Sequence, residues 1–169
     1  MIIDGHPVVR LGIKRLLEPD WDFEELTDGR GSVELLSSVG EIQVAIVEMR
    51  SAERGIPSGA ATIRRMLTAH SGLGVIAHGG QVERHALGEA IDAGARAYVS
   101  KRSSPTTIRT AVDAVLAERP FIDPDADRRH ATRPPITNRQ REILQLFADG
   151  CSTDEAAKRL GLSLSLIHI

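Results

Sequence analysis

Apolar residues in the first two thirds of the chain form short continuous runs that alternate with stretches of helical spacing. Five runs have the length and the β-branched or aromatic content of strands: 2–3, 21–26, 44–47, 73–77 and 97–100. The third run is apolar throughout, which is typical of a strand buried on both faces of a parallel sheet. The second run is less apolar, and this favours a position nearer the sheet edge.

Between these runs, apolar residues recur at intervals of three and four, as in amphipathic helices. The spacing predicts helices over 9–17, 32–36, 60–67, 82–93 and 105–115. Pro7 suits the first position of a helix, and Ser32 can cap the second helix. Residues 78–80, His-Gly-Gly, indicate a turn. Alternating strands and helices predict an α/β fold, a flavodoxin-like (βα)5 doubly wound parallel sheet.

Polar residues follow three of the predicted strands directly. Asp4, Glu48 and Lys101 come at the ends of the first, third and fifth strands. The carboxyl ends of parallel strands share one rim, where open α/β sheets bind ligands. Two carboxylates and a lysine suit a phosphoryl group with weakly held Mg²⁺. The plainer interpretation is that Glu48 only ends a strand and that Lys101 is a solvated lysine.

The composition changes after the last of these helices. Residues 118–135 combine four prolines with mixed charge and have no hydrophobic periodicity, as in a linker. Two capping-box patterns then follow, at 137–140 and 152–155, with Gly150 between the two helices that they open. We therefore predict a receiver-like domain at 1–117, a linker at 118–135 and a small all-α helix-turn-helix at 136–169.

Four segments together resemble one known family. They are 4–10 (DGHPVVR), 93–101 (AGARAYVSK), 136–144 (ITNRQREIL) and 150–157 (GCSTDEAA). The first two resemble the receiver of NarL/FixJ-type two-component response regulators, and the last two resemble the LuxR-type helix-turn-helix. Two modules in the order found in this family are a stronger signal than any single motif.

The resemblance implies a role for each residue of the rim. Glu48 stands at the phosphoacceptor position, Asp4 belongs to the acidic pocket, and Lys101 pairs with the phosphate. Tyr98 matches the aromatic residue that changes rotamer on activation, although simple core packing explains it equally well. Asp4 and Glu48 would also be the ligands of any weakly bound Mg²⁺; no other cofactor is expected.

The chain departs from the family at this same site. Glutamate replaces the acceptor aspartate, Gly5 replaces the second acid of the opening pair, and residues 77–79 hold no hydroxyl. The loss of one carboxylate weakens Mg²⁺ binding. We therefore predict a receiver that does not accept phosphate in the usual way, and a Glu48–Lys101 ion pair that partly imitates the phosphorylated state.

Other candidate residues carry weaker signals. Thr153, Lys158 and Arg159 are the predicted DNA contacts, but residues 137–163 hold four basic and four acidic residues, as a solvated face would. His6 is interpreted as structural, and the histidines at 70, 78 and 85 as surface or turn residues without the spacing of a metal site. Cys151 is interpreted as an inert small residue.

Composition limits the function classes and the compartment. The net charge of −2 predicts neither a nucleic-acid nor a membrane partner from bulk electrostatics. The single cysteine favours a reducing compartment, and no apolar run approaches the roughly 20 residues of a membrane span. We expect a cytoplasmic protein. Residues 164–169 follow the second helix closely, so the helix-turn-helix is expected to be cut short near its recognition helix and to bind DNA weakly or not at all.

The expected function is a DNA-binding transcriptional response regulator and not an enzyme. Its expected partners are DNA, a second copy of the chain, and a sensor histidine kinase or another signalling protein. One alternative is a protein-interaction pseudo-receiver that does not bind DNA. Another is a flavodoxin-like flavin or nucleotide binder, which residues 5–7 disfavour because they are not a glycine-rich phosphate loop.

Overall fold

The computed structural model describes residues 1–169 except 40, 51–55, 81–85, 125, 127–137 and 163–169. The chain divides into two compact units, Met1–Thr132 and Arg133–Ile169. Among the described residues, no helix has both the length and the apolar character needed to cross a membrane.

The first unit is built on a parallel sheet of six strands in the order β2-β1-β3-β4-β5-β6. The strands are β1 (Ile2–Ile3), β2 (Glu25–Leu26), β3 (Val44–Glu48), β4 (Gly74–Gly79), β5 (Ala97–Ser100) and β6 (Phe121–Ile122). This confirms the predicted doubly wound sheet and the edge position of the second strand. The strand order reverses between β1 and β3, where ligand crevices form in such sheets.

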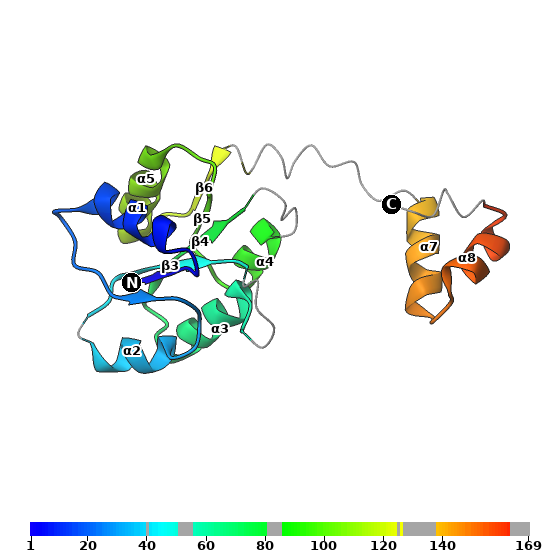
Figure 1. Ribbon diagram of the computed structural model, residues 1–169, viewed down its shortest axis with the longest axis horizontal. Helices are drawn as coiled ribbons and strands as arrows, with labels where there is room; N and C mark the ends of the chain where they lie inside the picture. Colours follow the sequence, from blue (N-terminus) through cyan, green and yellow to red (C-terminus); the bar gives the residue numbers. More distant parts are fainter. Residues whose placement is uncertain (40, 51–55, 81–85, 125, 127–137, 163–169) are drawn as a thin grey trace. The chain divides into compact units, whose positions relative to one another are not determined.

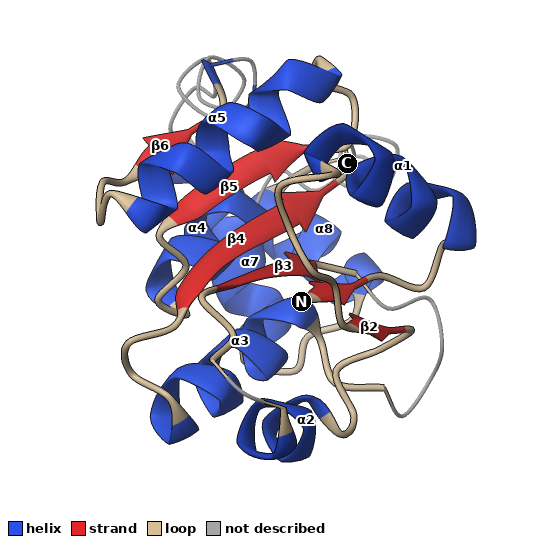
Figure 2. Cartoon of the chain, turned by 90° about the vertical axis from the view of Figure 1, so that its left-hand side faces the viewer, coloured by secondary structure: helices blue, strands red, loops and turns tan. Residues whose placement is uncertain are grey.

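Helices cover both faces of the sheet (Figures 1 and 2). Helices α1 (Pro7–Leu17) and α5 (Pro105–Leu116) lie on one face, and α2 (Ser32–Ser38), α3 (Gly59–Ala69) and α4 (Ala86–Asp92) lie on the other. Strand β3 serves both layers: Ile46 packs with α1 and α5, while Ala45 and Val47 pack towards α2, α3 and α4. Its apolar run is therefore buried on both sides, as predicted.

The strand β6 corrects the linker assignment for residues 118–135. Phe121 pairs with Ala97 and Ile122 pairs with Tyr98, which extends the sheet beyond the five predicted strands. Two residues are too few to show a periodicity of two, and the neighbouring prolines resemble those of a linker. The sheet therefore continues into a segment that the sequence pattern assigned to a connection.

Three local predictions need correction. The run 21–26 is a strand only at Glu25–Leu26. Residues 78 and 79 extend β4 and do not form a turn. Ser32 does not cap α2, because the left-handed Gly31 occupies that position and the buried Ser32 hydroxyl donates to the Gly29 carbonyl at 2.9 Å. Residues 82–85 of the predicted helix 82–93 lie outside the described residues.

The second unit contains α7 (Asn138–Ala148) and α8 (Thr153–Leu160). Ile143, Ala156 and Ala157 form its buried core. The capping box at 152–155 is confirmed, since Ser152 and Glu155 exchange hydrogen bonds between side chain and backbone. The capping box predicted at 137–140 cannot be checked, because residue 137 lies outside the described residues.

Candidate functional site

The parallel register brings the three predicted rim residues together. Asp4 follows β1, Glu48 ends β3, and Lys101 follows β5, with β4 between the last two strands. The Lys101 backbone N–H donates to the Gly79 carbonyl at 2.7 Å, which fixes the start of the turn after β5. A cavity of about 710 Å³ opens at this rim and is lined by all three side chains.

The Lys101 ammonium lies between the two carboxylates. It forms an ion pair with Glu48 Oε1 and another with Asp4 Oδ2 at 2.9 Å. The exposed fractions of the side chains are 2% for Asp4, 12% for Glu48 and 19% for Lys101. Burial acts to raise the pKa of Asp4, but Lys101 and the His6 backbone N–H outweigh it and hold this pKa below its ordinary value. The buried Asp4 carboxylate is therefore held in its charged form beside Lys101.

Residues 5 and 6 close the site from the α1 side. The Gly5 N–H donates to Glu48 Oε2 at 2.9 Å, and the His6 N–H donates to Asp4 Oδ1 at 2.9 Å. The His6 Nδ1 atom lies 3.0 Å from Asp4 Oδ1 and 3.3 Å from Glu48 Oε1. His6 therefore contacts both carboxylates. Its position before Pro7 in the sequence gave no indication of these contacts.

His78 is buried and is not the surface or turn residue that the sequence pattern indicated. It pairs with Glu48 in the ladder between β3 and β4, and its side chain is 5% exposed. Its Nδ1 atom lies 3.9 Å from Asp4 Oδ2 and makes no hydrogen bond. Burial first, and Lys101 second, lower the pKa of His78 to about 4, against the pull of Asp4. The imidazole is therefore neutral at pH 7.

Tyr98 lies against Gly79, the last of the three positions, 77–79, among which the resemblance places the family's hydroxyl residue. Tyr98 is buried, and a β-carbon added to Gly79 would overlap its hydroxyl group. The ring therefore occupies the space that a side chain at position 79 would need. The proposed switch role of Tyr98 stays a prediction, but its inward position is tied to the missing side chain at Gly79.

Asp123 supports the site from β6 and was not singled out in the sequence. It is buried, and its Oδ2 atom accepts hydrogen bonds from the Ser100 N–H at 3.0 Å and from the Ser103 hydroxyl. These two serines flank Lys101. An acid within a proline-rich, mixed-charge stretch gives no signal by itself, because its partners lie about 20 residues away in the chain.

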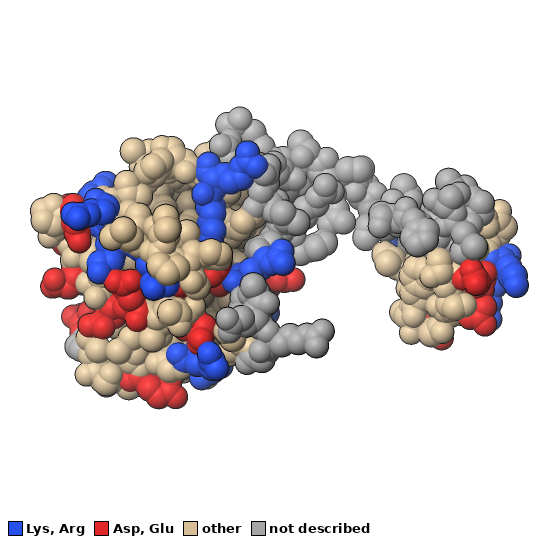
Figure 3. All heavy atoms as spheres, viewed as in Figure 1, with Lys and Arg blue, Asp and Glu red and all other residues tan. Residues whose placement is uncertain are grey.

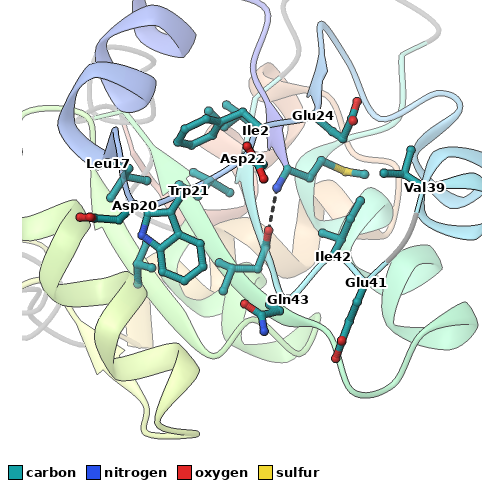
Figure 4. A pocket seen from close by; sticks show the side chains of 15 residues that line it. Ile2, Leu17, Asp20, Trp21, Asp22, Glu24, Val39, Glu41, Ile42 and Gln43 are labelled. Atoms are coloured by element: carbon teal, nitrogen blue, oxygen red, sulfur yellow. Dashed lines mark hydrogen bonds between the residues drawn. The ribbon is translucent and has the colours of Figure 1, made fainter.

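A second pocket lies at the opposite, amino-terminal edge of the sheet (Figure 4). It has a volume of about 580 Å³ and contains Trp21, Ile42 and Gln43 among its lining residues. Its lining acids Asp20, Asp22 and Glu41 are exposed, and Glu24 is half-buried. Its buried ionisable group is the amino terminus of Met1, which donates to the Val44 carbonyl at 2.8 Å. The buried carboxylate Asp4 and its partner Lys101 lie at the other rim, which is the candidate functional site.

The predicted DNA contacts lie on α8 in the second unit. Thr153 is half-buried at the first position of this helix, and Lys158 and Arg159 are exposed in its last turn. On the face drawn in Figure 3, acidic side chains of this unit lie directly beside basic ones. This face therefore shows no purely basic patch of the kind that binds nucleic acid by charge alone.

Comparison with known proteins adds an independent finding. Residues 1–113 match the response regulator receiver domain family. The chain is 31% identical to the transcriptional regulatory protein UhpA of Escherichia coli over 99% of its length and 85% of UhpA. It is 27% identical to the transcriptional activator ExaE of Pseudomonas putida, covering 99% of the chain and 83% of ExaE.

Solved structures are similar to the chain as well. A response regulator RcsB–DNA complex aligns with a TM-score of 0.77 at 24% identity, covering 98% of the chain and 84% of RcsB, which shows a shared fold. A LuxR-family response regulator from Aurantimonas aligns with a TM-score of 0.69 at 25% identity, over 78% of the chain and 93% of that protein.

Proposed function

The chain belongs to the response regulators of the NarL/FixJ type, and from this membership we propose that it regulates transcription through a receiver that works without phosphorylation. One observation carries the second half of this proposal. The Lys101 ammonium is already paired with a carboxylate, Glu48, at the position where the family accepts phosphate. The proposed receiver is not an enzyme.

Receiver domains of this family commonly bind Mg²⁺, and the residues here fit that ion poorly. Mg²⁺ requires an octahedral set of hard oxygen ligands. Asp4 and Glu48 supply carboxylates, but Gly5 supplies none, and the Lys101 ammonium lies between the two acids. We therefore assign Mg²⁺ no step in the function of this receiver.

Glu48 fails as an acceptor for geometric reasons. Its Oε1 atom is engaged by Lys101 and its Oε2 atom accepts the Gly5 N–H, so both oxygens are hydrogen-bonded. Residues 77–79 carry no hydroxyl group to bind a phosphoryl oxygen. The ion pair holds the turn after β5 without any phosphoryl group.

Phosphorylation tests this proposal directly. The chain is incubated with acetyl phosphate and Mg²⁺, and intact mass is measured. We expect no mass increase for the wild type. A double variant, Glu48→Asp with Gly5→Asp, restores the missing carboxylate and shortens the acceptor, and a β-carbon at Gly5 has room at 3.6 Å from Glu48 Oε2. We expect this variant to gain one phosphoryl group.

The control for chemical background is Glu48→Gln, which offers no acceptor carboxylate. A stable phosphoryl adduct on wild-type Glu48, absent from this control, would overturn the proposal. If the double variant also gains no phosphoryl group, the site lacks more than the two aspartates. Gly79 would then be the next position to change.

We propose that DNA contact is made through α8. UhpA is named a transcriptional regulatory protein, and the RcsB complex contains DNA; these likenesses, together with the exposed Lys158 and Arg159, support the assignment. A homodimer and a signalling partner such as a sensor kinase are proposed on the same basis. The pseudo-receiver without DNA binding is the alternative that the next experiment excludes.

Salt dependence of DNA binding tests this assignment. The chain is titrated with a fluorescent duplex at several salt concentrations. We expect weak binding, and the double variant Lys158→Ala with Arg159→Ala should reduce the slope of log K against log salt by about 2, because each lost phosphate contact removes about 0.9. The double variant Arg64→Ala with Arg65→Ala, at exposed positions of α3, should leave the slope unchanged. Equal slopes in all three proteins would contradict the assignment.

A further inference from the structure

A buried aspartate joins the sixth strand to the turn that carries Lys101. Asp123 directly follows β6 and is 2% exposed. Its Oδ2 atom accepts hydrogen bonds from the Ser100 N–H at 3.0 Å and from the Ser103 hydroxyl. A carboxylate forms stronger hydrogen bonds with such donors than a neutral acceptor does. One side chain therefore holds both ends of the turn 100–103.

The same turn is fixed to the candidate site on its other side. The Lys101 N–H donates to the Gly79 carbonyl at 2.7 Å, which bonds the turn to the end of β4. The Lys101 side chain reaches from this turn to Glu48 and Asp4. Any change in what Lys101 contacts therefore acts on a short turn whose opposite side is bonded to Asp123.

Strand β6 is attached to the sheet mainly by hydrogen bonds. It has two residues, lies at the edge of the sheet and pairs with β5 (Figure 2). Phe121 is half-buried and Ile122 is 39% exposed, so β6 buries less apolar area than the inner strands do. The Phe121 N–H donates to the Arg96 carbonyl at 3.1 Å, and the Asp123 N–H donates to the Tyr98 carbonyl at 2.9 Å. The side chain of Asp123 adds the hydrogen bonds that reach beyond this ladder.

Strand β6 also lies where the chain leaves the sheet towards the second unit, which begins at Arg133. Ala126 is attached together with it, because its N–H donates to the Asp123 carbonyl at 2.9 Å and its side chain packs against the core. Residues bound to the sheet cannot add to the reach of the connection between the units. Each residue released from the sheet would extend that reach by up to about 3.5 Å. Attachment of β6 therefore limits how far the second unit can extend from the first.

The plainer explanation is that Asp123 only stabilises a turn. In that case the attachment of β6 would not depend on what Lys101 contacts. Glu48 ends β3, and two strands, β4 and β5, separate β3 from β6 in the sheet. The two explanations therefore differ in whether a change at Glu48 alters the attachment of a strand that lies three positions away.

We propose that Asp123 couples the Glu48–Lys101 ion pair to the attachment of β6, and thereby to the length of the connection to the second unit. While Glu48 holds Lys101, the turn 100–103 is in position to donate both hydrogen bonds to Asp123. Release of Lys101 loosens this turn, and β6 detaches from the sheet edge. The coupling rests on the proposed function in one respect, namely that the Glu48–Lys101 pair is the state that the receiver holds in place of phosphorylation.

Amide hydrogen exchange, resolved by NMR on the whole chain, tests this coupling. The reporters are the N–H groups of Phe121 and Asp123, and the reference is Ile76 in the buried middle of β4. Glu48→Gln should accelerate exchange at both reporters by about tenfold relative to Ile76, because contiguous contact networks transmit effects of this size. The matched control Glu25→Gln, on the edge strand β2, should leave this ratio unchanged.

A second variant interrupts the coupling at Asp123 itself. Ser103→Ala removes one donor to this carboxylate and leaves the ion pair in place, so it should accelerate exchange at the same reporters. Ser104→Ala is its control, because the Ser104 hydroxyl lies 2.9 Å from Thr106 Oγ1. Combining Glu48→Gln with Ser103→Ala should accelerate exchange by less than the product of the two single effects, since both act through the same contact.

Four results would each overturn the coupling. They are unchanged reporters in Glu48→Gln, equal acceleration of the reporters and Ile76, equal exchange in Ser103→Ala and Ser104→Ala, and a double variant whose acceleration equals the product. Equal acceleration at Ile76 would mean that Glu48→Gln only lowers global stability. A phosphoryl adduct on wild-type Glu48 would instead overturn the proposed function. The exchange experiment contains no phosphate donor, so the two failures are distinguishable.

Discussion

Replacing Lys101 with methionine should lower the free energy of unfolding by about 3 kcal/mol at pH 7, because it leaves two adjacent carboxylates without their cation. Asp4 is almost fully buried and Glu48 is mostly buried, so water replaces the lost partner only in part. Methionine keeps the length and apolar stem of lysine, so the loss reports charge and not packing. Urea unfolding followed by circular dichroism measures it.

The pH dependence of this loss has a definite sign. Asp4 has a lowered pKa in the folded protein, so its ion pair contributes stability above the unfolded pKa of about 4 and loses it as the pH falls through the folded value. The difference between wild type and Lys101→Met should therefore be largest near pH 7 and shrink below pH 4. A difference that is independent of pH would contradict the electrostatic explanation.

Lys14→Met is the matched control for Lys101→Met. Lys14 also forms an ion pair with a glutamate, Glu25, at 2.6 Å, but both side chains are about one-third exposed. Exposed pairs contribute about 0.5 kcal/mol or less. If both lysine variants lose the same free energy of unfolding, the ion pairs at the rim contribute no more than an exposed pair.

Replacing Asp123 with alanine should lower the free energy of unfolding by about 2–3 kcal/mol. The buried carboxylate accepts the Ser100 N–H and the Ser103 hydroxyl, and alanine leaves both donors without this acceptor. Amide hydrogen exchange should accelerate at Ser100, next to Lys101. The stability loss and the faster exchange together measure how strongly Asp123, directly after β6, holds the turn that carries Lys101.

Asp113→Ala provides the comparison for Asp123→Ala. Asp113 is an exposed aspartate on α5, and substitutions at such positions usually change stability by less than about 0.5 kcal/mol. If Asp123→Ala unfolds at the same urea concentration as Asp113→Ala, the turn after β5 does not depend on β6. In that case the strand β6, although paired in the sheet, would contribute little to the free energy of unfolding, as expected of a linker.

The sheet was predictable from sequence because its central strands, β3, β4 and β5, are almost entirely apolar and are buried on both faces. Ile46 and Val47 are buried on opposite sides of β3, and a run of such residues is not typical of an exposed element. The two-residue strand β6 has too few side chains for any pattern. It is defined only by pairing with β5, which is a contact across 24 residues of the chain.

The part of the candidate site that lies at strand ends was predictable from the sequence. Asp4, Glu48 and Lys101 were placed by the rule that parallel strands share a carboxyl rim, and the structure brings them together. His78 was misjudged because the two glycines after it indicated a turn. The ladder continues through it instead, since it pairs with both Glu48 and Val99.

The contact between Gly79 and Tyr98 limits which substitutions this part of the site tolerates. A β-carbon at position 79 overlaps the Tyr98 hydroxyl, so a larger residue there requires the ring to move or Tyr98 to become smaller. A smaller residue at 98 meets no such overlap. A side chain at 79 is therefore expected to be tolerated better together with a smaller residue at 98 than by itself.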